Sequence, residues 1–228
     1  MRALFLCCLL FCALFSQGSE SNKVMRFNAP ADVPQARYVI ELMTRVYAEL
    51  GYKLLVQDFN HPNALIAANA GSLDGQLGRV ATVSNDYPNL RRIDFPLFKF
   101  KLQLVNFCRD CRYQDVNSIT IRSGYPVAED YLAQHPTSAY VVKVKSAVAQ
   151  LNLVMQQQVE AALLLDFHLK PHLAKLNLDK LQMTNLALVE SFHFVHKRHD
   201  DLVPLLKDKL EELERAGVVA ELKAKYQI

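Results

Sequence analysis

The chain has 228 residues, of which 51% are hydrophobic, 9% are aromatic and none is tryptophan. Its formal net charge is only +3 and its basic residues are scattered, so the basic stripe that nucleic-acid binding requires is missing from the sequence. Nothing in the composition is typical of a repetitive or disordered chain, so we expect one large or two small globular domains.

Residues 1–18 carry the three-part pattern of a secretory signal peptide. Met1 and Arg2 form a positive start, residues 3–15 form an apolar run, and Ser16 and Gly18 supply small residues for cleavage after Gly18. The run is shorter than the roughly 20 apolar residues of an ordinary membrane span. We therefore predict export to the periplasm, with an uncleaved N-terminal anchor as the alternative.

The first predicted elements alternate between strand and helix. Residues 24–28 predict a strand, followed by a helix with Asp32 as its expected cap, Pro34 in its first turn and Gln35 placed to reach back to the cap. Apolar residues at helical spacing continue as far as Gly51, which should end this helix. Further along, residues 53–57 predict a strand, 60–70 a helix and 73–80 a strand. This order favours a parallel sheet with helices on both faces.

A long predicted strand at residues 98–107 separates this unit from a second one. Asp200 is the expected cap of a later helix with an apolar stripe, Gly217 should end that helix, and a short helix follows to about residue 226. Between them, strands are predicted at 118–122, 139–142, 159–165, 180–189 and 192–195, and helices at 123–134, 146–157 and 167–176, the last broken by Pro171. Two successive β/α units predict a two-lobed α/β protein. Ligands of open α/β sheets lie at the carboxyl ends of strands, so the expected site is a cleft between the lobes.

Cys108 and Cys111 are the only cysteines that follow the predicted signal peptide. In an oxidising compartment, two cysteines at this spacing favour a local disulfide. A thiol-redox site and half of a zinc site are the alternatives, although no matching second pair of zinc ligands is obvious.

Five segments resemble, in the same order, those of the extracellular solute-binding proteins of family 3, the amino-acid-type periplasmic binding proteins. They lie at residues 47–52, 65–75, 92–96, 159–162 and 199–226. The resemblance covers nearly all of the chain after the signal peptide. It implies the type II periplasmic-binding fold, with a mostly parallel sheet flanked by helices in each lobe and two hinge crossings. Lobe one would comprise residues 19–102 plus 190–228, and the inserted lobe two would comprise residues 103–189.

The same resemblance locates two departures from the family pattern. The arginine that grips the ligand carboxylate in typical relatives falls on Asn89 here. The aspartate that takes the ligand amine falls on Leu165, with Asp166 one residue later. We therefore expect that the chain is built like an amino-acid binder without carrying the family's amino-acid clamp.

Several polar residues follow predicted strands and are candidates for ligand binding. Arg79 could hold a carboxylate or phosphate bidentately, with a structural ion pair to Asp74 or Asp86 as the alternative. Backbone N–H groups at a helix start can bind an anion, and Asp166 could meet a ligand amine. The full candidate set is Arg79, Asn28, Asn60, His61, Ser123, Gly124, Tyr125 and Asp166.

The histidines offer a weaker hypothesis of a metal site. His193, His196 and His199 are three residues apart, but their segment predicts a strand, on which His193 and His196 face opposite sides. His168 and His172 are four apart, with Pro171 between them. We expect no metal and no cofactor.

The resulting prediction is a periplasmic solute-binding protein that is not an enzyme. It would close, as a monomer, around a small polar or anionic metabolite for transport or sensing, and would present it to an inner-membrane transporter or receptor. One alternative is an enzyme on the same scaffold, dehydratase-like, that uses Arg79 with Asp166 or His61. Another is a degenerate pair of lobes that acts through protein contacts.

Overall fold

The computed structural model describes residues 23–59, 61–169 and 181–228, with the backbone alone for residues 61–63. The predicted signal peptide, Asn60 and the predicted helix break at Pro171 lie outside the described residues. Within them, no helix has the length and apolar character needed to cross a membrane.

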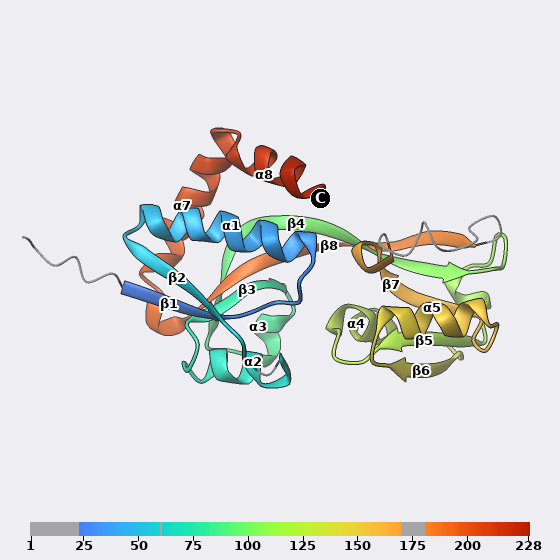
Figure 1. The fold of residues 1–228 in the computed structure, drawn as a ribbon. Coiled ribbons are helices and arrows are strands. Elements are labelled where there is room, and N and C mark those ends of the chain that lie inside the picture. The colour runs from blue at the N-terminus through green and yellow to red at the C-terminus, as the bar shows by residue number, and fades with distance from the viewer. Residues whose placement is uncertain (1–22, 60, 170–180) are drawn as a thin grey trace, which may run out of the picture.

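Two groups of elements are joined by two long strands, β4 (Leu90–Asn106) and β8 (Gln182–His196), which run side by side between them (Figure 1). The first group holds β1 (Lys23–Asn28), α1 (Pro34–Glu49), β2 (Tyr52–Gln57), α2 (His61–Asn69), β3 (Gly75–Val80), α3 (Val83–Asp86), α7 (Leu202–Arg215) and α8 (Val218–Tyr226). The second holds β5 (Ser118–Arg122), α4 (Pro126–Gln134), β6 (Tyr140–Val144), α5 (Ala147–Met155), β7 (Ala161–Leu165) and α6 (Asp166–Leu169). The chain is thus a two-lobed α/β protein with two crossings. The division at residues 102 and 190 stays a prediction.

The strands form a two-stranded parallel sheet, β1-β2, and a six-stranded sheet in the order β3-β8-β4-β7-β5-β6. In the second lobe, β5 pairs in parallel with both β6 and β7. In the first lobe, β3 pairs antiparallel with β8. It meets β1 only at its start, where the Asp74 N–H donates to the Arg26 carbonyl (2.8 Å) and the Arg26 N–H donates to the Asp74 carboxylate (2.6 Å). A buried carboxylate therefore replaces part of a β-ladder.

The crossing strands are longer than the sequence predicted. Strand β4 begins at Leu90 rather than near residue 98, and β8 is one strand where two were predicted. The two pair from Leu90↔His196 to Asn106↔Gln182, with register shifts on either side of Pro96. Proline lacks an N–H for the ladder and is accepted in strands at such irregularities. The pairing across both lobes, which no local pattern reveals, makes each strand continuous.

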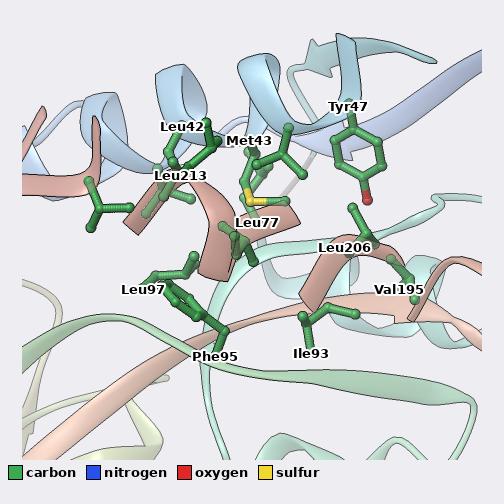
Figure 2. Packing of buried hydrophobic residues seen from close by; sticks show 14 of the residues in the cluster. Leu42, Met43, Tyr47, Leu77, Ile93, Phe95, Leu97, Val195, Leu206 and Leu213 are labelled. Carbon is green, nitrogen blue, oxygen red and sulfur yellow. The ribbon is translucent and has the colours of Figure 1, made fainter. Parts of the chain in front are cut away.

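The core of the first lobe lies between helices α1 and α7 and the strands beneath them (Figure 2). Leu42 of α1, Leu206 of α7 and Ile93 of β4 are each fully buried there. Full burial of such side chains contributes about 1.5–3 kcal/mol each to folding. This packing fixes α1, and with it the start of that helix, against the sheet.

Two predicted helix caps are wrong. The residue before α1 is Val33, without a side-chain cap, and Asp32 instead pairs with Arg37 at 2.6 Å. The residue before α7 is Asp201, also without a capping bond, and Asp200 pairs with Arg91 at 3.1 Å. In both cases a nearby arginine holds the carboxylate that was expected to cap.

The predicted helix ends are confirmed. Gly51 follows α1 with φ 78° and Gly217 follows α7 with φ 81°. These left-handed conformations favour glycine because it lacks a Cβ.

Candidate functional site

A cavity of about 150 Å³ lies where the two lobes face each other. One wall belongs to the start of α1 and the end of β3, and the opposite wall belongs to residues at the starts of α4 and α6. It is lined by Pro30, Ala31, Val33, Gln35, Ala36, Val39, Leu77, Gly78, Arg79, Phe98, Tyr125, Phe167 and His168. A molecule in this cavity would touch both lobes at once.

Arg79 reaches the cavity from the end of β3. Its guanidinium donates a hydrogen bond to the Gly78 carbonyl at 3.1 Å, and burial lowers its pKa. The expected alternative of a pair with Asp74 is wrong, because Asp74 binds Arg198 and His199. In the described part of the chain Arg79 forms no ion pair with a carboxylate, Asp86 included. Its positive charge is therefore free to meet an anion.

Two helix starts lie at the same cavity. Val33 is the residue before α1, Tyr125 is the residue before α4, and both helices have proline in their first turn. The first turn of a helix carries partial positive charge, which favours a nearby anion. Together with Arg79 they make the cavity electropositive on both sides.

Gln35 supplies an acceptor that the sequence interpretation missed. The residue is 8% exposed and its Oε1 has no hydrogen-bond partner within the described structure. The expectation that Gln35 reaches back to cap α1 is wrong, since that cap has no side-chain bond. Buried acceptors normally have a donor, so this oxygen is suited to a donor on a ligand.

Aromatic rings form the wall that comes from the second lobe. Phe167 packs on Phe100 at 5.3 Å and on His168 at 4.4 Å between ring centroids. His168 meets Tyr125 at 5.2 Å, and the Arg122 guanidinium lies over the Tyr125 ring at 4.0 Å. The wall is held by its own ring contacts and is therefore in place without a ligand.

Asn28 and Ser123 do not line this cavity. Asn28 is buried, and its amide accepts from the Phe59 N–H (3.0 Å) and donates to the Ala29 carbonyl (2.9 Å). The Ser123 N–H donates to the Val144 carbonyl at 2.8 Å.

Asp166 and Gly124 do not line this cavity. Asp166 starts α6, accepts from the Phe167 N–H at 2.8 Å and is not part of the cavity lining. Gly124 forms the turn before α4 with φ 74°. The side chain of His61, like all of Asn60, lies outside the described residues. Whether any of these candidates binds a ligand stays a prediction.

The predicted disulfide between Cys108 and Cys111 is confirmed, with 5.5 Å between their Cα atoms. His193 is fully buried and shares a hydrogen bond with the Tyr47 hydroxyl at 2.8 Å. Among the residues that the structure describes, no group of three histidine, cysteine or acidic side chains is placed to hold a metal ion.

Sequence comparison gives one distant relative. No family model matches the chain. An uncharacterized protein from Shewanella oneidensis is 21% identical over 196 residues, which make up 80% of this chain and 73% of that protein.

Comparison with solved structures is more informative. The substrate-binding protein of an amino-acid ABC transporter matches with a TM-score of 0.68 at 16% identity, over 89% of this chain and 98% of that one. A mutant of ArgBP from T. maritima matches with a TM-score of 0.69 at 17% identity, over 91% and 96%. The GluR0 ligand-binding core in complex with L-glutamate matches with a TM-score of 0.67 at 17% identity, over 90% and 96%. At these identities the likeness shows the fold. The chain has the two-lobed periplasmic-binding-protein-like fold and in this respect resembles the amino-acid solute-binding proteins of family 3.

Proposed function

We propose that this chain is a periplasmic solute-binding protein that closes its lobes around a small anionic metabolite. The observation that carries the proposal is Arg79, which lines the interlobe cavity without a carboxylate partner in the described structure. Arg79 is half-buried, and withdrawing a charge from water without a counter-charge is costly. A bound carboxylate or phosphate would supply the missing charge and could accept two parallel hydrogen bonds from the guanidinium.

The placement of the cavity supports closure as part of binding. Arg79 belongs to one lobe, whereas Tyr125 and His168 belong to the other. A ligand that contacts both favours the arrangement in which the lobes are close, because only differential contacts shift a conformational equilibrium. We also propose that the two lobes comprise residues 19–102 plus 190–228 and residues 103–189.

Binding without catalysis fits the lining best. The described residues around the cavity include no serine, cysteine or carboxylate, the usual nucleophiles and general bases besides histidine. The dehydratase-like alternative is kept as an outcome of the test, since one fold relative is an ancestral amino-acid-binding protein described as a precursor of cyclohexadienyl dehydratase.

Thermal-shift measurements test the binding proposal. The chain without residues 1–18 would be screened against organic acids, phosphates, amino acids and neutral sugars. A ligand at about 100 times its Kd stabilises the native state by about 2.7 kcal/mol, which is readily measured. We expect anions to stabilise the protein and neutral sugars to have no effect. Turnover of a stabilising compound would favour the enzyme alternative.

A matched pair of variants connects the result to the cavity. Arg79→Met should remove the stabilisation by anions. Arg112→Ala, which removes the same charge at an exposed arginine paired with Asp115, should leave it unchanged. Equal responses of the two variants, or no stabilisation by any anion, would contradict the proposal.

Export and delivery need their own test. We propose that residues 1–18 are cleaved and that the bound metabolite is presented to an inner-membrane transporter or receptor. N-terminal sequencing of protein recovered from a periplasmic extract should begin at Ser19. Recovery of a full-length chain in the membrane fraction would favour the uncleaved anchor instead.

A further inference from the structure

The lining of the interlobe cavity also indicates which chemical groups its ligand can carry besides a negative charge. In amino-acid recognition an ammonium group must be taken from water, and burying it without a carboxylate is costly. The cavity offers Arg79 and two helix starts, all electropositive, and its described lining contains no acidic side chain. An added positive charge on the ligand would be repelled from three directions.

The two nearest acidic residues in the sequence are already engaged. Asp32, beside the start of α1, is exposed and paired with Arg37 at 2.6 and 2.9 Å. Asp166, at the start of α6, accepts the Phe167 N–H at 2.8 Å and does not line the cavity. In the structure neither carboxylate lines the cavity in which a ligand ammonium would lie.

The rest of the lining is suited to a flat ring. Phe98, Tyr125 and Phe167 line the cavity, and ring contacts to Phe100 or His168 hold all three in place. Aromatic rings prefer edge-to-face or offset contacts with other rings, which adds to the gain from burying apolar surface. The cavity volume of about 150 Å³ has room for one ring and not for two.

One polar feature remains beside the apolar lining. The Gln35 Oε1 is buried in the first turn of α1 and has no donor in the described structure. The carboxylate that Arg79 attracts cannot satisfy it, because both are acceptors. A neutral hydroxyl on the ligand would satisfy it without bringing a positive charge.

We infer that the ligand is a one-ring aromatic monocarboxylate, preferably with a neutral hydroxyl group, and not an α-amino acid. Arg79 and the helix starts hold the carboxylate, the aromatic wall holds the ring, and Gln35 accepts from the hydroxyl. This assignment rests on the proposed function and specifies its substrate class.

Three compounds that differ in a single substituent test it directly. Phenylacetate, mandelate and phenylglycine share a ring and a carboxylate and carry hydrogen, hydroxyl or ammonium on the same carbon. Calorimetric titration of the chain that begins at Ser19 should show mandelate binding about three- to tenfold more tightly than phenylacetate. Phenylglycine should bind at least about tenfold more weakly than phenylacetate. Cyclohexylacetate, which has the same charge without an aromatic ring, should also bind more weakly than phenylacetate.

Two variants separate the roles of the side chains. Gln35→Met keeps the volume and removes the acceptor, so mandelate should lose its advantage over phenylacetate while phenylacetate still binds. Asp166→Asn removes the carboxylate on which amino-acid recognition would depend, and it should leave the order of the three compounds unchanged. Melting curves without ligand establish that each variant is folded, and the comparison of the three compounds on the unmodified chain does not depend on either.

Each remaining outcome has a definite meaning. Tighter binding of phenylglycine, or of any other α-amino acid, would overturn the substrate class and leave the proposed function standing. Binding of aliphatic anions such as succinate in preference to the ring compounds would do the same. If no anion of either panel binds, both the substrate class and the proposed function are wrong.

Discussion

Protonation of His193 should destabilise the fold in mild acid, because burial disfavours the charged ring. This side chain is fully buried in the first lobe. Its Nδ1 lies 3.3 Å from the Leu77 carbonyl and its Nε2 lies 2.8 Å from the Tyr47 hydroxyl. The neutral ring satisfies both partners if Nδ1 donates to the carbonyl and Nε2 accepts from the hydroxyl. Burial lowers the pKa of His193 from 6.5 to about 4.

The sign and the size of the effect follow from this pKa. The unfolded chain binds a proton at His193 below about pH 6.5, whereas the folded chain resists it until about pH 4. The contribution to stability is therefore fully present above pH 6.5 and is lost as the pH falls toward 4. At about 1.36 kcal/mol per pH unit, the loss reaches about 2 kcal/mol at pH 5 and about 3 kcal/mol at pH 4.

Urea unfolding between pH 4 and pH 8 measures this loss. The reference is the double variant His193→Leu with Tyr47→Phe, which removes the titrating ring together with the hydroxyl that it would leave unpaired. Other acid-sensitive groups, Asp74 among them, are shared by both proteins and cancel in the difference. The free energy of unfolding of the unmodified chain should fall more steeply in acid, by about 2 kcal/mol at pH 5. Parallel curves would show that His193 titrates normally and would refute the reasoning.

Three further outcomes are expected. Arg79→Met should raise the free energy of unfolding of the ligand-free protein by about 1 kcal/mol, because a charge without a carboxylate partner is replaced by an apolar side chain; a loss of stability in urea unfolding would show that Arg79 has a structural partner. Gly75→Ala should lower the free energy of unfolding by about 3 kcal/mol or more, because the new Cβ would overlap the backbone of β8. Gly51→Ala, which lies in open space at φ 78°, should lower it by about 1 kcal/mol, and equal losses for the two variants would contradict the packing around Gly75. Replacing Cys108 and Cys111 by serine should lower the free energy of unfolding by only about 2 kcal/mol, since the closed loop is short. A larger loss in urea unfolding would show that the disulfide does more than restrict the unfolded chain.

Local patterns predicted most of the elements because their signals lie within a few residues. Apolar residues at helical spacing and a following glycine located α1 and α7, whose ends at Gly51 and Gly217 are confirmed. The caps were missed because an aspartate near a helix start can either cap the helix or pair with a cation. At Asp32 the competing partner is Arg37, five residues away. Which interaction wins depends on the side-chain geometry, which the pattern does not contain.

The crossing strands show a limit of a different kind. Residues 90–97 include Pro96 and two arginines, which obscure the alternation of Ile93, Phe95 and Leu97 that is typical of a strand. They are extended because β8, about 100 positions later in the sequence, pairs with them. Long-range pairing overrides local preference, as is general for strands.

The site was predictable in part. Arg79 lies near the end of β3 and Tyr125 shortly after β5, and both line the cavity. Gln35 was assigned to a cap and His168 to a metal hypothesis, because their residue types suggest local roles. Only the packing of the two lobes shows that they share a cavity with Arg79.

The distribution of the site over two lobes sets what the ligand must provide. The electropositive groups of β3 and α1 belong to one lobe, and the aromatic wall with the start of α4 belongs to the other. An anion without a ring would contact Arg79 and the helix starts but would leave the aromatic wall without a contact, so it would gain less from closure. A ring without a charge would leave Arg79 unpaired in a closed cleft, which opposes closure. A molecule that carries both groups would contact both walls of the closed cavity, which is the reason for inferring a ligand with a ring and a carboxylate.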